Sequence, residues 1–309
     1  MRFRLTRLDA LLLAMAAIWG GNYSLIKSAL DEVPPLAFNG VRLALASALF
    51  LVAIRVRSAH QAGRAGGTRP RTLSPRDWRG IVALAVVGQC VYQLLFISAL
   101  ARTSVANSSL IIACTPIFVA LISAGLGQER VTPWQWAGAA LSAAGIYIVV
   151  GGGAAVTRAT IAGDLMMLSA VVCWSASTVG ARRLVARMSP LVVTGYSMAI
   201  GCVFYLPFAW PAIRRVGWGS VSSHAWWAVA LSAVFALCVA YMIWYTALER
   251  IGNTRTSVYS NMVPIAAMLV AWLWLGERIG PSKLAGAAAI LIGVALTKIQ
   301  AVAAVPEPA

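Results

Sequence analysis

Acidic and metal-binding side chains are scarce in this sequence. Its 309 residues include 9 Asp and Glu, 2 His and 5 Cys, against 25 Lys and Arg, which gives a formal net charge of +16. The acids lie in predicted loops, at helix ends or near the C-terminus, and the cysteines lie singly inside apolar runs. Metal sites and general acid–base catalysis need such groups close together. The sequence therefore predicts no cofactor, no metal site, no catalytic residue and no enzymatic activity.

Charged residues of either sign are also few, at 11% of the chain, while 60% of the residues are hydrophobic. A soluble domain carries about 25% charged residues. Several apolar runs reach about 20 residues, the length that a helix needs to cross about 30 Å of hydrocarbon. The basic residues fall between these runs, as in cytoplasmic loops, rather than on a nucleic-acid-binding surface. We therefore predict an all-α polytopic membrane protein whose partner is the lipid bilayer, with no nucleic acid partner.

Ten apolar segments are predicted to be transmembrane helices. They are 8–30, 36–56, 78–100, 104–126, 133–151, 161–184, 190–210, 225–247, 254–275 and 281–299. Pro133, Pro190 and Pro281 stand where three of them begin, and proline suits a first turn because its missing N–H would have no partner there. With the N-terminus inside, most Lys and Arg fall on the side of both termini. By the positive-inside rule this predicts a multi-pass protein of the cell inner membrane with both termini cytoplasmic.

The first half of the chain recurs in the second half. Pro116 and Glu129 match Pro264 and Glu277 at one spacing (264 − 116 = 148), and many neighbouring residues keep the same register. Because five helices per half is an odd number, the two halves enter the membrane from opposite faces, as inverted repeats do. The expected units are a first five-helix repeat, 1–152, a second, 153–300, and a disordered tail, 301–309.

Several short motifs appear in order along the chain. Trp19-Gly20-Gly21-Asn22 lies in the first helix, Pro35 precedes Arg42 in the second, and Ala99-Leu100 and Ala247-Leu248 open the repeated blocks. In this order they resemble the drug/metabolite transporter superfamily of the EamA type, over nearly the whole chain. The resemblance implies ten helices in an inverted five-plus-five repeat, with export or exchange of small metabolites through a central cavity. Within the superfamily the chain is similar to the amino-acid exporters.

Polar and aromatic side chains gather on one face of most of these helices. Such groups are costly in lipid unless they face protein or a water-filled cavity, so we expect a substrate-binding cavity between the first four helices of each half. The residues predicted to line it are Trp19, Asn22, Tyr23, Asn39, Arg42, Gln89, Tyr92, Gln93, Trp174, Ser177, Tyr241, Trp244, Tyr245 and Asn261. Pro116 and Pro264 are predicted to kink their helices and to act in gating, because each frees one backbone carbonyl. The alternative is ordinary packing, in which polar side chains hydrogen-bond between helices.

Matched positions of the two halves differ on these faces. Gln93 corresponds to Tyr241 and Arg42 to Ser197, so one half is rich in amides and the other in aromatic rings. This favours an amphipathic solute, and we predict a transporter that exports small metabolites, amino acids above all, by alternating access. The alternatives are a carrier of nucleotide sugars or lipophilic cations, and an intramembrane enzyme. The partner is then a small-molecule substrate; a monomer is plausible, and the sequence does not set the oligomeric state.

The positions of the acidic residues also bear on energy coupling. None of the 9 Asp and Glu residues, and neither His, lies near the middle of a predicted membrane span. Proton-coupled carriers place such groups inside the membrane as relays. We therefore expect facilitated movement or exchange rather than transport driven by protons.

Overall fold

The computed structural model describes residues 6–63, 73–126, 133–151 and 157–299, and within these ranges the chain is helical apart from short connections. The helices are α1 (Arg7–Ala29), α2 (Pro35–Gly63), α3 (Pro75–Leu84), α4 (Tyr92–Leu100), α5 (Val105–Ile112), α6 (Thr115–Gly125), α7 (Pro133–Gly151), α8 (Arg158–Val185), α9 (Pro190–Ile213), α10 (Ser223–Leu231), α11 (Ala240–Tyr259), α12 (Met262–Leu275) and α13 (Pro281–Ile299). Two π-helical segments join neighbouring helices, η1 (Ala85–Val91) and η3 (Ser232–Val239), and η2 (Trp218–Ser220) is a short 3-10 turn. The predicted all-α class is confirmed, while the predicted tail at 301–309 lies outside the described residues.

Local sequence explains where the helices begin. The Thr6 hydroxyl accepts a hydrogen bond from the backbone N–H of Asp9 at the start of α1, and the Asp9 carboxylate accepts one from the N–H of Thr6. Such a capping box satisfies two N–H groups that the helix leaves without partners, and a cap of this kind contributes about 1 kcal/mol. The three prolines predicted at helix starts are the first residues of their helices: Pro133 of α7, Pro190 of α9 and Pro281 of α13.

Helices that can cross a membrane dominate the described ranges. 7 of them are long and apolar enough by length and composition: Arg7–Ala29, Pro35–Gln61, Pro75–Leu100, Val105–Gly125, Arg158–Val185, Pro190–Ile213 and Ser223–Asn253. The other predicted segments contain the shorter apolar helices Trp136–Ile148, Met262–Leu275 and Pro281–Gly293. The chain is therefore a multi-pass membrane protein, and the count of ten spans stays a prediction.

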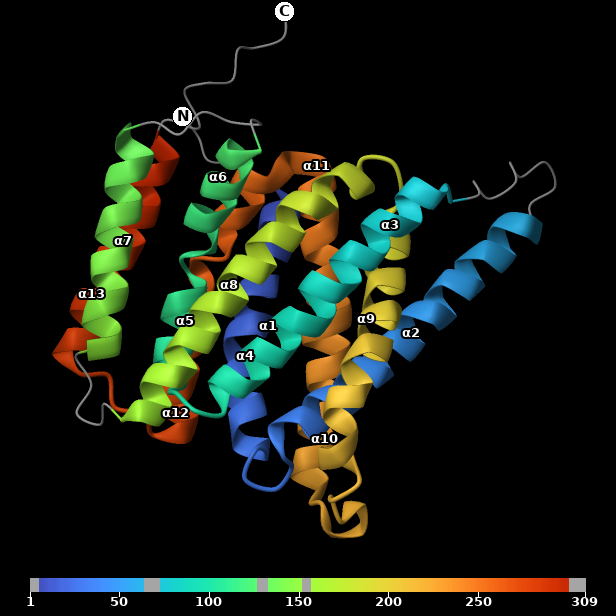
Figure 1. Cartoon of the computed structure of the whole chain (residues 1–309), viewed down its shortest axis with the longest axis horizontal. Helices are drawn as coiled ribbons and strands as arrows, with labels where there is room; N and C mark the ends of the chain where they lie inside the picture. Colours follow the sequence, from blue (N-terminus) through green and yellow to red (C-terminus); the bar gives the residue numbers. More distant parts are fainter. Residues whose placement is uncertain (1–5, 64–72, 127–132, 152–156, 300–309) are drawn as a thin grey trace, which may run out of the picture.

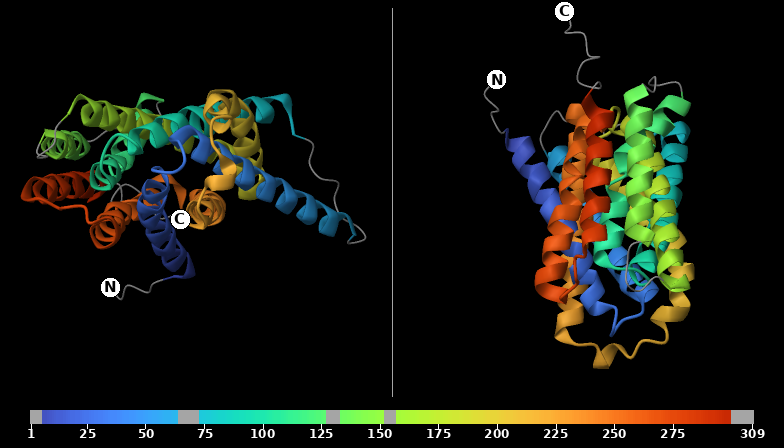
Figure 2. Two further views of the ribbon diagram at one scale, coloured as in Figure 1. Left: turned by 90° about the horizontal axis from the view of Figure 1, so that it is seen from below. Right: turned by 90° about the vertical axis from the view of Figure 1, so that its left-hand side faces the viewer.

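The helices form one bundle in which matched elements of the two halves pack together. α2 packs along α9, and α7 packs along α13. The α7–α13 pair stands at one end of the bundle, at the left of Figure 1 and of the left view in Figure 2. α1 begins and α13 ends on the same side, the upper edge of Figure 1, whereas α8 begins at the lower edge. The first helices of the two halves, α1 and α8, therefore run through the bundle in opposite directions.

Small residues hold α7 and α13 close together. A Cβ added to Gly145 would lie 2.8 Å from the Ile290 side chain and 2.9 Å from the Gly286 carbonyl oxygen. A Cβ added to Gly293 would lie 2.3 Å from the Ser142 hydroxyl. These distances are too short for real contacts, so glycine is required where the two backbones approach, as is common between membrane helices.

The helices predicted to bend at a proline are broken for two residues next to it. α5 ends at Ile112 and α6 begins at Thr115, next to Pro116; α11 ends at Tyr259 and α12 begins at Met262, two residues before Pro264. The carbonyl that Pro116 frees, on Ile112, accepts a 2.6 Å hydrogen bond from the Thr115 hydroxyl. A role of the two prolines in gating stays a prediction.

One predicted helix boundary was also misplaced. The segment predicted at 225–247 continues through α11, and the described backbone leaves the helical conformation at Gly252, where φ is 77°. Glycine is the residue that adopts such a positive φ without a steric cost. The predicted spans 225–247 and 254–275 left residues 248–253 as the connection, whereas a single glycine makes the turn within α11.

Candidate functional site

A cavity lies at the centre of the bundle, where the two halves meet. Its walls come from α1, α2, α4 and α8, from η3 and α11, and from both helix interruptions; the lining residues are Trp19, Asn22, Tyr23, Arg42, Tyr92, Gln93, Phe96, Ile112, Thr115, Trp174, Ala236, Leu237, Tyr241, Ser260 and Val263. The volume open to the centre of a water molecule is about 50 Å³. One water needs about 10–15 Å³ on this measure. The cavity is thus narrow, with room for a few waters or a small chemical group.

More than half of the predicted residues line this cavity. They are Trp19, Asn22, Tyr23, Arg42, Tyr92, Gln93, Trp174 and Tyr241. Periodicity found them because one face of a buried helix repeats every three or four residues.

The other predicted residues lie elsewhere for identifiable reasons. Gln89 packs against α9, where a Cβ added to Gly201 would lie 2.3 Å from its Cβ atom. Ser177 donates to the Trp174 carbonyl at 2.9 Å and lines an outer groove with Arg183. Trp244 and Tyr245 are buried behind the cavity wall, Asn39 is buried in α2, and Asn261 immediately precedes α12.

A hydrogen-bonded chain connects the two halves at the cavity wall. The fully buried Arg42 guanidinium donates from Nη1 to the Ser232 hydroxyl at 2.8 Å and from Nη2 to Gln93 Oε1 at 3.0 Å. Gln93 Nε2 in turn donates to the Tyr241 hydroxyl at 3.3 Å. Gln93 and Tyr241 are separated by 148 residues, the spacing of the repeat. Matched positions of the two copies therefore touch at the cavity.

The π-helical segment η3 supplies a further link. A π-helix changes the pattern of backbone hydrogen bonds and often occurs at functional sites. The Trp19 indole Nε1 donates to the Ala236 carbonyl of η3 at 3.0 Å, which joins α1 to the other half. Ala236 and Leu237 line the cavity beside this contact.

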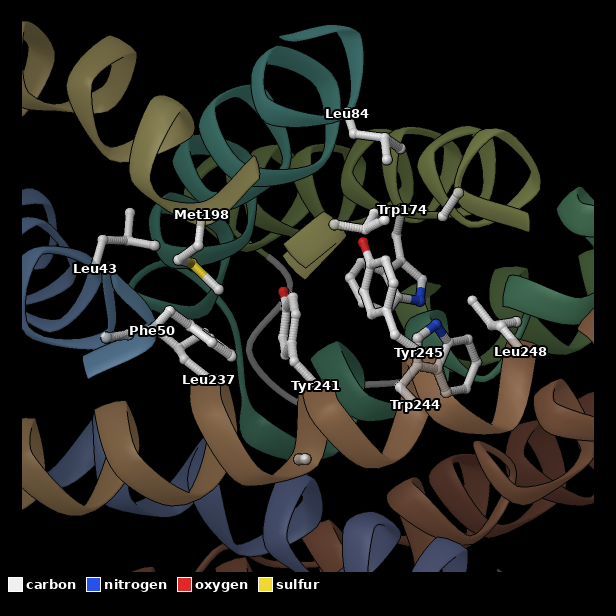
Figure 3. Close-up of a cluster of buried hydrophobic side chains, with 14 of the residues drawn as sticks. Leu43, Phe50, Leu84, Trp174, Met198, Leu237, Tyr241, Trp244, Tyr245 and Leu248 are labelled. Atoms are coloured by element: carbon white, nitrogen blue, oxygen red, sulfur yellow. The ribbon is translucent and has the colours of Figure 1, made fainter. Parts of the chain in front are cut away.

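Aromatic rings from both halves pack into one cluster beside the cavity. Ring centroids lie 5.8 Å apart for Trp19 and Trp174, 6.0 Å for Trp19 and Tyr241, and 5.4 Å for Trp174 and Tyr241. Trp244 backs the cluster at 5.5 Å from Trp19, and Tyr245 stacks on Tyr241 at 6.3 Å. Figure 3 shows Tyr241, Trp244 and Tyr245 extending from α11 toward Trp174. These rings form an apolar cluster that joins the Arg42–Gln93 chain through the Tyr241 hydroxyl.

At one end of the bundle, a carboxylate from the second half caps a helix of the first half. Glu277, just before α13, accepts hydrogen bonds from the backbone N–H groups of Val105 at 2.9 Å and Ala106 at 3.3 Å. Both N–H groups belong to the first turn of α5, where the helix dipole favours a negative charge. The contact fastens the two halves together at this end.

Two matched aspartates make similar contacts at opposite ends. Asp164 on α8 is buried and accepts from the Thr103 hydroxyl at 2.6 Å and from Asn107 Nδ2 at 3.1 Å. Asp9 on α1 accepts from the Tyr259 hydroxyl of α11. In each pair, the first helix of one half is tied to the other half.

Lys27, a second cation on a membrane helix, lies in the last turn of α1 and outside the cavity. Its Nζ donates to the Leu100 carbonyl at 3.1 Å and to the Thr103 carbonyl. Among the described lining residues, Arg42 is therefore the only one that carries a charge.

Some lining residues were not predicted. Thr115 and Val263 each immediately precede a proline. Ile112 and Ser260 carry the carbonyls that those prolines free. The positions of the two prolines in the sequence could therefore have identified these lining residues. Ala236 and Leu237 are ordinary apolar residues, and only the π-helical geometry brings them to the cavity.

Comparisons with known proteins place this geometry in a family. Residues 6–151 and 161–299 each match the EamA-like transporter family. An uncharacterized transporter of Archaeoglobus fulgidus is 30% identical, over 93% of this chain and 96% of its own length. The probable terminal-alkyne amino-acid exporter of Streptantibioticus cattleyicolor is 29% identical, over 90% of this chain and 89% of its own.

Further similarity comes from Bacillus subtilis and from a solved structure. The uncharacterized transporter YyaM of that bacterium is 25% identical, over 92% of this chain and 91% of its own. A crystal structure superimposes with a TM-score of 0.66 at 24% identity, covering 95% of this chain and 99% of the other, which shows a shared fold. The chain therefore belongs to the EamA-like transporter family, and it is a membrane transporter rather than an enzyme.

Proposed function

We propose that this transporter exports small amphipathic metabolites, amino acids above all, by alternating access through the central cavity. In this proposal ten helical segments cross the cell inner membrane as two inverted five-helix repeats, 1–152 and 153–300. Both termini face the cytoplasm, and a single chain is sufficient to form the path.

The contacts between matched positions support the inverted repeat. Gln93 contacts Tyr241 at the 148-residue spacing of the repeat, and Trp19 contacts Trp174, its match at the spacing of 155 residues that relates the first helices of the two halves (174 − 19 = 155). Two copies related by an axis in the membrane plane meet in this way near the axis, and transporters with such repeats bind their substrates there. The common side of the start of α1 and the end of α13 supports termini on one face.

The observation that carries the proposed substrate class is the mixed lining of the cavity. It combines a guanidinium and an amide with several aromatic rings. The single positive charge disfavours lipophilic cations, because like charges repel strongly in a buried site. It also disfavours nucleotide sugars, whose two phosphates would require more than one cation.

Two further features favour amino acids. The buried Asn22 Oδ1, on a residue that lines the cavity, has no hydrogen-bond partner and could accept one from an amino group. The relative from Streptantibioticus cattleyicolor is named a probable amino-acid exporter. We extend that substrate class to this chain as part of the proposal.

The carboxylate contacts at the two ends support the gating step. Glu277 and Asp164 hold the lower end together, and Asp9 with Tyr259 holds the upper end. In an alternating-access cycle one set must open while the other stays closed. Pro116 and Pro264 lie beside the helix interruptions, where the backbone could change direction during this motion.

Counterflow into proteoliposomes tests the function. Vesicles loaded with one unlabelled solute are given a labelled trace of the same solute, across a panel of aromatic and aliphatic amino acids, a nucleotide sugar, a hexose and tetraphenylphosphonium. We expect accumulation of label for amino acids with large apolar side chains. Accumulation of the nucleotide sugar or the cation alone, or of no solute in the panel, would contradict the proposal.

The same vesicles test energy coupling. With equal amino acid inside and outside, an imposed pH gradient should cause no net accumulation, because none of the described acidic residues lines the cavity. Net accumulation that a protonophore abolishes would contradict facilitated movement and would point to Asp9 or Asp164 as the proton carrier.

A further inference from the structure

Arg42 is the most unusual group in the cavity. Its side chain is 1% exposed in a membrane protein, and it lines the central cavity, where α1, α4, α8 and α11 meet. The Ser232 hydroxyl and Gln93 Oε1 accept one hydrogen bond each from it. Its Nε has no hydrogen-bond partner.

The charge on this guanidinium lacks a compensating anion at the cavity. Arginine stays protonated in proteins, so its burial cannot be relieved by losing a proton. Burying an ion without an opposite charge is costly. None of the described acidic residues lines the cavity, and the partners Ser232 and Gln93 are neutral. A negatively charged group of a bound solute would therefore compensate the charge of Arg42.

We propose that Arg42 binds the carboxylate of the transported solute, and that the solute class is monocarboxylates with an apolar or aromatic tail. This inference rests on the proposed transport function and makes its substrate class more specific. A guanidinium has five N–H donors in a planar fork that matches a carboxylate, and Arg42 uses one on each terminal nitrogen for protein contacts. One cation compensates one negative charge, which favours a carboxylate over a phosphate or a dicarboxylate.

The position of Arg42 also couples this binding to both halves. Ser232 belongs to the second half and Gln93 to the first, and Gln93 continues to Tyr241 of the second. A carboxylate on Arg42 would therefore sit where the halves join. The tail would extend toward the rings of Trp19, Trp174 and Tyr241, which also line the cavity. Because the cavity is narrow in this structure, the tail would enter when the two halves separate in the proposed alternating-access cycle.

A matched pair of ligands tests the charge requirement in the unmodified protein. 3-Phenylpropanoate and 3-phenylpropanamide have nearly the same shape and differ in charge. Binding of each to the full chain in lipid nanodiscs is measured by isothermal titration calorimetry. Because a hydrogen bond to a charged group is stronger than a neutral one, we expect the carboxylate to bind at least about tenfold more tightly than the amide.

Variants assign that preference to Arg42. Arg42→Gln should reduce the carboxylate-to-amide ratio to about one, and Arg42→Lys, which keeps the charge but loses the fork, should retain part of it. Arg102→Gln is the matched control, because Arg102 is exposed and donates to the Ser98 carbonyl within its own segment. Circular dichroism and thermal unfolding identify any variant that fails to fold. The carboxylate-to-amide affinity ratio of the unmodified protein is a separate test that does not depend on the variants.

The outcomes separate this inference from the transport function. Equal binding of the two ligands by the unmodified protein, or binding of neither, would overturn the carboxylate site. A ratio unchanged in a folded Arg42→Gln variant would overturn the role of Arg42. If counterflow of amino acids persists in either case, the transport function stands while this inference fails; if the ratio holds but no solute is exchanged, the function fails instead.

Discussion

The α7–α13 pair and the central cavity use the duplicated sequence in opposite ways. In the pair, matched positions keep the same small residue, as Gly145 and Gly293 do, and the two helices pack through them. At the cavity, the matched tryptophans Trp19 and Trp174 are kept, but Gln93 and Tyr241 differ and bond to each other. Duplication thus supplies a symmetric scaffold, and divergence at the contact between the copies supplies chemistry that one copy alone does not have.

The largest expected effect comes from breaking the scaffold. Gly145→Ala and Gly293→Ala each place a Cβ less than 3 Å from neighbouring atoms, backbone atoms included. Overpacking of this kind costs about 1–3 kcal/mol, so thermal unfolding should occur at a clearly lower temperature, while the order of solute preference stays unchanged.

The matched control for these substitutions is Gly21→Ala on α1. No atom lies within 4 Å of a Cβ added at Gly21. Replacing a helical glycine by alanine is then neutral or stabilising, by up to about 1 kcal/mol. If all three variants unfolded at the same temperature, close packing of α7 on α13 would not be what holds the scaffold.

An intermediate effect is expected at the junction between scaffold and cavity. Glu277→Gln removes the charge that the first turn of α5 stabilises, a contribution of about 0.3–2 kcal/mol. Counterflow rates should change for every solute by a similar factor, because the contact closes one end and does not select the solute. Glu249→Gln, at an exposed position on α11, is the control. A change confined to one solute would contradict a gating role.

The smallest effect is expected at a surface contact that belongs to neither region. The Glu32 carboxylate accepts hydrogen bonds from the Ser222 hydroxyl at 2.7 Å and from its backbone N–H at 2.9 Å, and these lower the pKa of Glu32. A lowered pKa in the folded state adds stability above the unfolded value of about 4.3, and this is lost as pH falls through the folded pKa.

Unfolding temperatures of the unmodified protein and Glu32→Gln measure this contact. The two should differ slightly at pH 6 and converge as the pH falls through the lowered pKa of folded Glu32, with Asp31→Asn as the neighbouring control. A difference that grows on acidification would have the wrong sign for this linkage.

Sequence patterns predicted the parts of this molecule that periodicity and composition determine. Mean hydropathy and the spacing of the apolar runs indicated membrane helices, and three-and-four spacing identified Trp19, Asn22 and Tyr23 as one buried face. Each of these features depends on the residues of one helix alone, so it can be predicted from the sequence without knowing how the helices pack.

What the sequence did not predict depends on geometry between helices. Gln89 and Gln93 look equivalent at four-residue spacing, yet Gln89 lies in η1 and packs on α9, while Gln93 lies in α4 and reaches the cavity. A π-helical turn shifts the face by one residue, and no residue type marks it. The interruptions before Pro116 and Pro264 are similar, because the proline marks the place but not whether the helix bends or stops.

The central claim is that residues at the contact between the two copies select the solute, and relative counterflow rates in Gln93→Ala and Tyr241→Ala test it most directly. Each variant removes one partner of the bond between Gln93 and Tyr241. We predict that the ratio of rates for phenylalanine and for a small amino acid such as alanine changes about tenfold, a loss of roughly 1.4 kcal/mol of discrimination. Ratios unchanged in both variants, with folding intact, would contradict the assignment of the cavity.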